Sequence, residues 1–208
     1  MTHFSDLIHA DTGTALISEW ITGTPERSHA VADAVIDEWA AGEKPSARLA
    51  QHMFLSTDGA SLLFYAQWTS DEDHLAWARA HRSEMVSRID TLVPGIERPG
   101  LNRTRLHSSL VHDAGPHPGV FVVTTTVADE VEATVRPAPG LLAAHIHLTT
   151  DGQPTTDGGR AVIVTEWTDA ASHDAAAATH ATGALGFKRY TLHHSFPNGV
   201  AQRASSGT

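Results

Sequence analysis

An internal repeat limits the folds open to this chain more than any other feature of its sequence. Landmarks of the first half recur in the second half in the same order, at spacings of 93 to 99 residues through the middle of each copy. Such a period predicts a duplicated structural unit. The paired landmarks are 49–52 with 142–145, 64–69 with 163–168, His81 with His180, and 104–108 with 190–195.

Apolar spacing in the first half alternates between the strand and the helix period. A helix is expected to begin at Pro25 and to end at Gly42, and Asp58-Gly59 is typical of a hairpin turn. The order β-α-β-β-α-β is that of the split βαβ unit. Its elements are predicted as strands at 15–22, 46–56, 61–68 and 101–110, with helices at 25–41 and 71–92.

The second half repeats this order in a shortened form. Its first helix is predicted only at 129–136, because two prolines follow at 137–140, and an alanine-rich helix is predicted at 170–182. A longer hairpin loop is expected at 151–159. We therefore predict three parts: a first module at 1–111, a linker at 112–118, and a trimmed second module at 119–208 with a flexible C-terminal tail.

A four-stranded sheet with helices on one face needs cover on its other face, and two such sheets can cover each other. The predicted fold class is therefore α+β, with two ferredoxin-like βαββαβ modules in one chain forming a pseudo-dimeric α/β barrel. We expect the halves to pack sheet against sheet, as in symmetric homodimers. The expected assembly is a monomer, which is itself a pseudo-dimer, or a homodimer.

Composition excludes several classes of function. The formal net charge of −10 argues against nucleic-acid binding, which needs a basic surface. The absence of cysteine excludes disulfides and thiolate chemistry. Neither a signal peptide nor an apolar run long enough to span a membrane is visible, so we expect no membrane partner and a cytoplasmic location.

Two motifs carry a resemblance to a known family. Ser56-Thr57-Asp58-Gly59, followed by Tyr65-Ala66-Gln67-Trp68-Thr69-Ser70 before an acidic helix, resembles the antibiotic biosynthesis monooxygenase family. The resemblance covers most of residues 14–110 and, more faintly, 119–196. It implies a dimeric α/β barrel, and many members oxidise aromatic polyketides in actinobacteria.

In members that convert an anthrone into a quinone, the resemblance implies three pocket residues, namely a histidine, an asparagine and a tryptophan. Only the tryptophan is kept in the first half, as Trp68. In the second half the histidine and the tryptophan are both kept. The three positions are Phe54, Phe64 and Trp68 in the first half and His147, Ile163 and Trp167 in the second.

Side-chain parity along strands suggests which residues share a surface. We expect a pocket between one surface of the first sheet and the helix that follows it, because flat apolar walls with a few polar groups suit a polycyclic aromatic ligand. The alternative for each side chain is ordinary core packing. The expected surfaces are His52, Phe54, Phe64, Ala66 and Trp68, then His145, His147, Ile163, Thr165 and Trp167, with His74, Trp77, Ala78, His81 and Met85 on the helix.

The predicted function is oxygenation of a fused-ring aromatic polyketide with O2, by hydroxylation, quinone formation or oxidative ring cleavage. His52 or His81 is the predicted base and the Trp68 indole the predicted donor. The alternative is a non-catalytic or cyclase-like polyketide-binding protein. We expect the first half to hold the site, because its helices are full length. The predicted substrate contacts are Phe54, Phe64, His74, Trp77, Met85, His147 and Trp167.

No tightly bound cofactor is expected, since GxGxxG, P-loop and GxSxG motifs are all missing. The resemblance leaves reduced flavin open as a diffusible co-substrate, because some relatives that cleave polyketide rings depend on it. A metal at His145 and His147 is a further alternative, which would need His52 or Glu166 as a third ligand.

Overall fold

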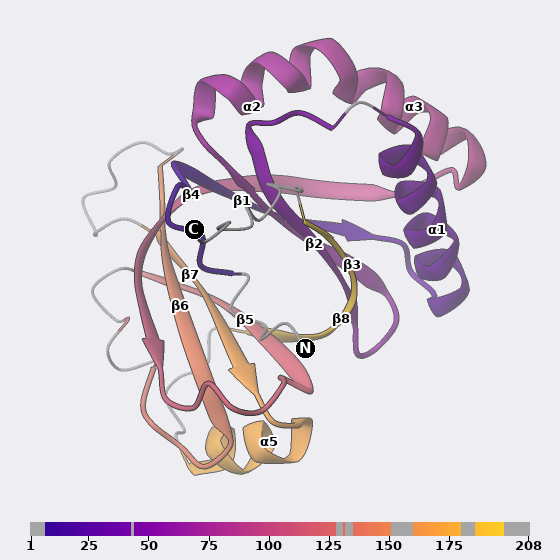
Figure 1. The fold of residues 1–208 in the computed structure, drawn as a ribbon. Helices are drawn as coiled ribbons and strands as arrows, with labels where there is room; N and C mark the ends of the chain where they lie inside the picture. The colour runs from indigo at the N-terminus through magenta and orange to yellow at the C-terminus, as the bar shows by residue number, and fades with distance from the viewer. Residues whose placement is uncertain are drawn as a thin grey trace, which may run out of the picture.

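We describe the fold from a computed structural model, in residues 7–42, 44–127, 131, 135–150, 160–179 and 186–197 (Figure 1). The elements are β1 (Thr14–Ile21), α1 (Pro25–Ala41), β2 (Arg48–Ser56), β3 (Ser61–Trp68), α2 (Asp71–Trp77), η1 (Ala78–Arg82), α3 (Ser83–Leu92), β4 (Glu97–Val111), β5 (Val120–Val127), β6 (Leu141–Thr149), β7 (Arg160–Trp167), α5 (Ala170–Thr179) and β8 (Phe187–Pro197).

The strands form one closed antiparallel barrel in the order β1-β3-β2-β8-β5-β7-β6-β4. Read in two parts, the order is β4-β1-β3-β2 and then β8-β5-β7-β6, so both halves place their strands alike. Pairing of β2 with β8 and of β4 with β6 joins the halves. The predicted α+β, ferredoxin-like fold with antiparallel sheets is confirmed.

Local sequence explains where the helices begin. The Thr24 hydroxyl accepts a hydrogen bond from the Arg27 backbone N–H, and Pro25 occupies the first turn of α1. The Ser70 hydroxyl accepts from the Asp73 backbone N–H at 3.1 Å and so caps α2. α1 begins and ends where its proline and glycine predict.

The helix predicted over 71–92 is interrupted by the π-helical segment η1 between α2 and α3. A π turn contains more residues than an α turn, so it rotates the following side chains relative to the preceding ones. His81, which lies inside η1, is exposed. Its ring centroid still lies 6.0 Å from that of Trp77, as expected for two residues of one stripe, but the side chain is exposed to solvent.

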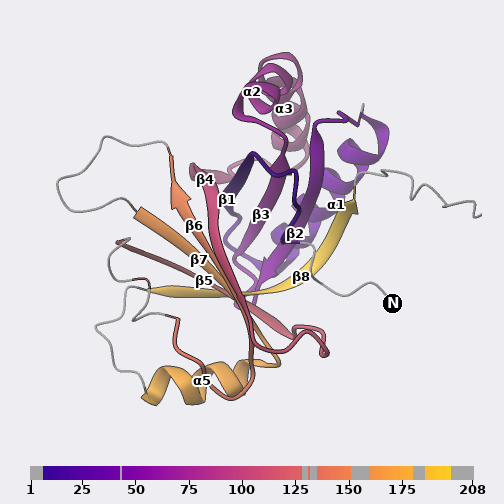
Figure 2. The same cartoon turned by 60° about the vertical axis from the view of Figure 1, so that its left-hand side comes forward.

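Two layers of core lie on opposite sides of the barrel wall. α1 and α3 cover the outer face of β1, β3 and β2, whereas α5 covers the second half (Figures 1 and 2). A separate core fills the barrel interior. The outer core of the first half includes Trp20, Val31, Met53, Phe64 and Ile89, and the interior core includes Leu7, Ile17, Phe54, Tyr65 and Val162.

Several sequence predictions lie outside the described residues. They are most of the helix at 129–136, the hairpin loop at 151–159, His180 and the C-terminal tail. Within the part of the chain that the structure describes, no helix combines the length and apolarity that crossing a bilayer requires.

Gly13 and Gly119 occupy the same place at the start of β1 and β5. Their N–H groups donate to the carbonyls of Trp68 and Trp167, each at 2.9 Å. A Cβ on Gly13 would lie 1.9 Å from the Thr69 carbonyl oxygen, and one on Gly119 would lie 2.3 Å from the matching oxygen of the second half. No side chain fits at these two crossings without a shift of the backbone.

We expect Gly13→Ala to lower the free energy of unfolding by about 1–3 kcal/mol, because the added methyl forces two backbones apart. Urea denaturation followed by circular dichroism measures this change. Gly186→Ala is the matched control, since a Cβ there meets nothing within 4 Å. Equal stability of the two variants would contradict the close approach at Gly13.

Candidate functional site

A cavity of about 190 Å³ lies in the first half, between the outer face of the sheet and the helices. A buried water needs only about 10–15 Å³ by a comparable measure, so the cavity has room for a ring system. Its walls are mainly apolar. The aromatic and sulfur-containing lining residues are Trp20, Trp39, Phe64, Trp68, Trp77 and Met85, and the polar ones are Ser18, Gln51, His74, Arg82 and Arg98.

The aromatic walls are held by ring contacts. Trp39 and Trp77 stack with ring centroids 5.1 Å apart and planes inclined by 15°. The ring centroids of Trp77 and Trp68 also lie 5.6 Å apart, and those of Phe64 and Trp20 lie 4.8 Å apart. Flat, mutually supported walls of this kind favour a planar aromatic guest.

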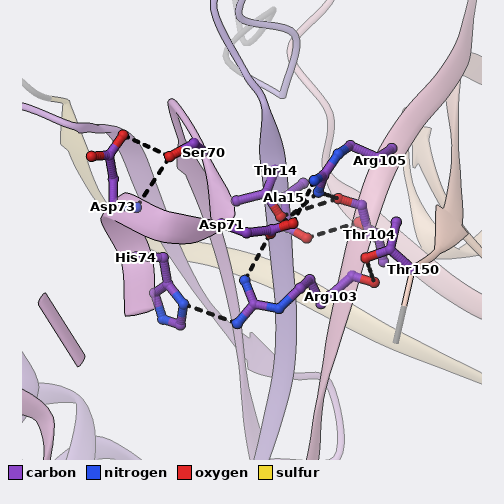
Figure 3. Close-up of polar contacts among 10 residues, drawn as sticks. All are labelled: Thr14, Ala15, Ser70, Asp71, Asp73, His74, Arg103, Thr104, Arg105 and Thr150. Atoms are coloured by element: carbon purple, nitrogen blue, oxygen red, sulfur yellow. Dashed lines mark hydrogen bonds and ion pairs between the residues drawn. The ribbon is translucent and has the colours of Figure 1, made fainter. Parts of the chain in front are cut away.

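His74 is the histidine of this cavity, and its tautomer is set by Arg103. The Arg103 guanidinium donates to His74 Nδ1 at 3.1 Å (Figure 3). Arginine can only donate, so Nδ1 carries the lone pair and Nε2 carries the hydrogen. Burial, followed by the charges of Arg103 and Arg82, lowers the pKa of His74 to about 4. At neutral pH His74 is therefore an uncharged donor.

Asp71 fixes Arg103 in this position. Its carboxylate accepts from Arg103 at 2.8 Å and from Arg105 at 2.5 Å (Figure 3). These bonds, with Arg105 the larger contributor, hold the pKa of Asp71 well below its usual range. The carboxylate is thus committed to the two arginines and supplies no base to the cavity.

The same tryptophan–histidine–arginine arrangement occurs in the second half. Trp68 meets His74 edge to face at 5.3 Å, and Trp167 meets His173 in the same way at 5.1 Å. His173 Nδ1 accepts from Arg189 at 2.9 Å, as His74 does from its own arginine. The sequence repeat therefore includes side-chain contacts of the outer face.

The two tryptophans differ in what their indole N–H groups do. The Trp167 N–H donates to the Thr165 hydroxyl at 2.9 Å. Ala66 stands at the matching position of the first half, and no described residue accepts a hydrogen bond from the Trp68 N–H. The first half therefore leaves this donor available at the wall of its cavity.

Strand register corrects the predicted surface of the first sheet. His52 pairs with Tyr65 and Phe54 with Leu63, so His52 and Phe54 face the barrel interior. Phe64 pairs with Met53, which packs against the helices. The prediction that His52 and Phe54 share a surface with Phe64 and Trp68 is wrong, because parity along one strand does not fix its register against the next.

The second sheet needs the same correction. His145 pairs with Val164 and His147 with Val162, and these valines belong to the interior core. Ile163 and Trp167 lie on the outer face instead, in the clusters on the helix side. The predicted common surface of the two histidines with Ile163, Thr165 and Trp167 is therefore wrong.

Histidine–serine pairs join the halves inside the barrel. His52 Nδ1 lies 2.9 Å from the Ser195 hydroxyl where β2 meets β8. His145 Nδ1 lies 2.9 Å from the Ser109 hydroxyl where β4 meets β6. These two landmark histidines therefore make equivalent contacts at the two junctions, remote from the outer cavity.

The interior also holds the residues considered for a metal. His145 Nε2 contacts Glu166 at 2.9 Å, and Tyr65 contacts His147 Nε2 at 3.4 Å. Burial, followed by the neighbouring His145, lowers the pKa of His147 to about 3, so this ring is neutral. Among the described residues, no group of three or more such side chains is arranged to hold a metal ion.

A second cavity, of about 220 Å³, opens at the barrel interior near Glu19 and Tyr190. The Glu19 carboxylate already accepts hydrogen bonds from Ser61, Lys188 and Tyr190 at 2.6–3.1 Å. Because these polar groups satisfy one another, the aromatic cavity of the first half is the stronger candidate site.

The structure thus gathers half of the predicted site. Five predicted residues line the cavity, whereas the two predicted bases do not: His52 is inside the barrel and His81 is exposed. His147 is interior, and Trp167 belongs to the second half. Sequence reasoning missed Gln51, Trp39 and Arg82, for which only the strand register and the helix positions give a signal. The five retained residues are Phe64, Trp68, His74, Trp77 and Met85.

Comparison with known proteins finds a family match in the second half. Residues 122–195 match the model of the antibiotic biosynthesis monooxygenase family. The predicted resemblance to this family is confirmed over these residues, which lie in the half where the motif resemblance is fainter. Among curated proteins, none matches the sequence.

Solved structures share the whole arrangement. An anthrone oxidase-like protein aligns with a TM-score of 0.66 at 16% identity, covering 91% of this chain and 95% of its own. A proposed monooxygenase from Lactobacillus acidophilus NCFM aligns with a TM-score of 0.52 at 9% identity, over 89% and 96%. A mutant chlorite dismutase from Candidatus Nitrospira defluvii reaches 0.53 at 11% identity, over 91% and 94%. These identities establish the fold alone.

Burial and the Arg103 contact predict a low pKa for His74. Its pKa should lie near 4, so between about pH 4 and the ordinary pKa of 6.5 the unfolded chain binds a proton that the folded chain does not. The stability due to burying the neutral ring should be complete above pH 6.5 and should be lost as the pH falls towards 4. NMR titration of the His74 ring measures the pKa, and the nitrogen shifts should show hydrogen on Nε2.

Two variants test whether Arg103 contributes to the low pKa of His74. Arg103→Gln should raise the pKa of His74, because it removes a nearby positive charge. Arg105→Gln, which also removes a partner of Asp71 but no bond to His74, should change it less. Equal effects of the two would show that Arg103 does not set the state of this ring.

Proposed function

We propose that the protein oxygenates a fused-ring aromatic polyketide with O2 in the cavity of the first half. The match of residues 122–195 to the antibiotic biosynthesis monooxygenase family supports the type of reaction. The observation that carries this proposal is a planar-walled cavity whose tryptophan N–H has no acceptor among the described residues. The anthrone oxidase-like neighbour supports the substrate class by its fold.

The proposed chemistry is oxidation of an electron-rich phenol or anthrone. An anthrone carbanion passes electrons to O2 and forms a carbon–oxygen bond, and the peroxide takes up a proton. Loss of the second proton at that carbon then breaks the O–O bond, so anthrone and O2 give quinone and water. Trp68 and the His74 Nε2–H supply hydrogen bonds to the developing oxygen anion, and the tryptophan walls exclude water.

We also propose that the chain is a tandem duplication that forms its own pseudo-dimer. Supporting it are the repeated strand order, the paired histidine–serine contacts and the paired glycine crossings. The proposed boundaries are 1–111 for the first module, 112–118 for the linker and 119–208 for the second.

A non-catalytic or cyclase-like polyketide carrier is the second candidate function. It is favoured by one observation: no carboxylate lines the cavity in the described part of the chain, and its histidine is fixed as a donor. Oxygen uptake with a phenolic polycycle separates the candidates, because a carrier consumes none.

We propose that O2 is the co-substrate and that no cofactor is tightly bound. The purified protein should be colourless, and elemental analysis should find no stoichiometric transition metal. A flavin or Soret absorbance band would contradict this. Addition of reduced flavin to the oxygen-uptake assay tests whether a diffusible flavin is required.

Loss of the Trp68 donor should slow the reaction. We expect Trp68→Phe to reduce turnover of an anthrone by roughly ten-fold or more, as for the loss of one positioned donor. The subtler change is Ala66→Thr, which places at position 66 the residue that binds the indole N–H in the second half. It should also lower turnover while keeping both the tryptophan and the fold. Oxygen electrode measurements give both rates.

Thr165→Ala is the reciprocal control, since it frees the Trp167 N–H in the other half and should leave the rate unchanged. The opposite assignment is tested by His147→Ala. If that change abolishes activity while Trp68→Phe has no effect, the working site lies in the second half.

A further inference from the structure

The polar groups around the first-half cavity are nearly all positive or hydrogen-donating. Its charged lining residues are Arg82 and Arg98, and no described aspartate or glutamate lines it. Arg98 is paired with Asp90 at 2.7 Å, but Arg82 forms no ion pair with any described residue. This local charge contrasts with the formal net charge of −10 of the whole chain.

Arg48 adds a buried positive charge directly behind the cavity wall. The side chain is 1% exposed, and its guanidinium lies 3.9 Å above the ring of Trp39, a wall residue. No carboxylate pairs with it in the described part of the chain, and its Nε has no acceptor there. A buried charge without a counter-ion is costly. An anion in the adjacent cavity would offset that cost.

Arg48 also orients Gln51, which lines the cavity. The Arg48 Nη1 lies 3.5 Å from the Gln51 side-chain oxygen, which can only accept. The Gln51 amide NH2 is therefore the group that remains for a ligand. Together with the Trp68 indole N–H and the His74 Nε2–H, the wall then presents three neutral donors.

We infer that the cavity selects its aromatic ligand as an anion, a phenolate or enolate, and that the protein stabilises this anion instead of generating it with a side-chain base. This inference rests on the proposed function for the kind of ring system involved. It accounts for an oxygenase cavity without a base, because an ionised phenol or anthrone already has the electron density that O2 accepts. It also assigns Arg48 and Arg82 a role in substrate selection.

The probe for the test is 2-hydroxyanthraquinone, which is already oxidised and changes colour when its phenol ionises. Saturating protein should lower the pKa of the bound phenol by about 1–2 units, as a nearby cation does. The anion should then bind at least tenfold more tightly than the phenol. The neutral control is 2-methoxyanthraquinone, which has a similar shape and cannot ionise. It should bind at least tenfold more weakly at pH 8.

Between pH 5.5 and 8.5 the protein groups that face the ligand keep their charge. His74 is neutral, given its pKa of about 4, and Asp71 is held ionised by its two arginines. Burial lowers the pKa of Arg48 only to about 10, so its guanidinium stays protonated in this range. The ring of His81 contacts the wall residue Trp77 with centroids 6.0 Å apart, so the pH dependence is measured in His81→Gln as well, and the part common to both proteins reports the ligand.

Arg82→Gln should shrink the shift in ligand pKa, whereas Arg160→Gln, an exposed arginine of the second half, should not. Arg48→Gln should shrink it further, and Arg48→Lys should partly restore it; circular dichroism checks that each variant folds. An unchanged or raised pKa of the bound phenol, or equal affinity for the methoxy compound, would overturn the inference.

The test separates the inference from the proposed function. Binding of the phenolate without oxygen uptake from an anthrone supports the inference and defeats the oxygenase. Oxygen uptake by a protein that binds the probe as a neutral phenol supports the oxygenase and defeats the inference.

Discussion

Closure of the barrel through the β2–β8 and β4–β6 pairs is the constraint on which the rest of the structure depends. Closure gives every strand an inside and an outside face, and neighbouring strands must agree on them. The inside receives the histidine–serine pairs and the apolar interior core. The outside of the first half receives the helices and, beneath them, the aromatic cavity. A side chain's chemical role therefore follows from its register.

Sequence periodicity predicts most of the fold, because it reports which residues along one element share a face. The order β-α-β-β-α-β along the first half follows from it, while matched landmarks predict the repeat and Pro25 predicts the start of α1. Periodicity carries no information on how one strand slides against the next, and a shift of one residue exchanges the two faces. Parity alone therefore groups His52 and Phe54 with Trp68, whereas in the structure they lie on the opposite side of the barrel wall from it. The π turn at η1, which exposes His81, leaves no trace in the pattern either.

The two halves keep the same scaffold and differ in single polar contacts. Thr165 occupies the Trp167 indole N–H, and Ala66 leaves the matching donor of Trp68 without an acceptor in the described structure. Inside the barrel, Glu166 contacts His145, whereas Gln67 stands at the corresponding position of the first half. The proposed duplication would allow one half to keep contacts that hold the fold while the other exposes polar groups to a ligand.

The family match and the candidate cavity fall on different halves, and the halves differ in the same polar contacts. The family model matches 122–195, the half whose tryptophan is tied to its own strand. The half with the cavity has phenylalanine at two of the three family positions and keeps the tryptophan at the third. Phe64 lines the cavity where the resemblance implies an asparagine, whereas Phe54, at the position where it implies a histidine, faces the barrel interior. A cavity whose described lining holds no carboxylate can act on an aromatic ligand if the ligand brings its own negative charge, and in the inference drawn above Arg48 and Arg82 supply the positive charge that such a ligand requires.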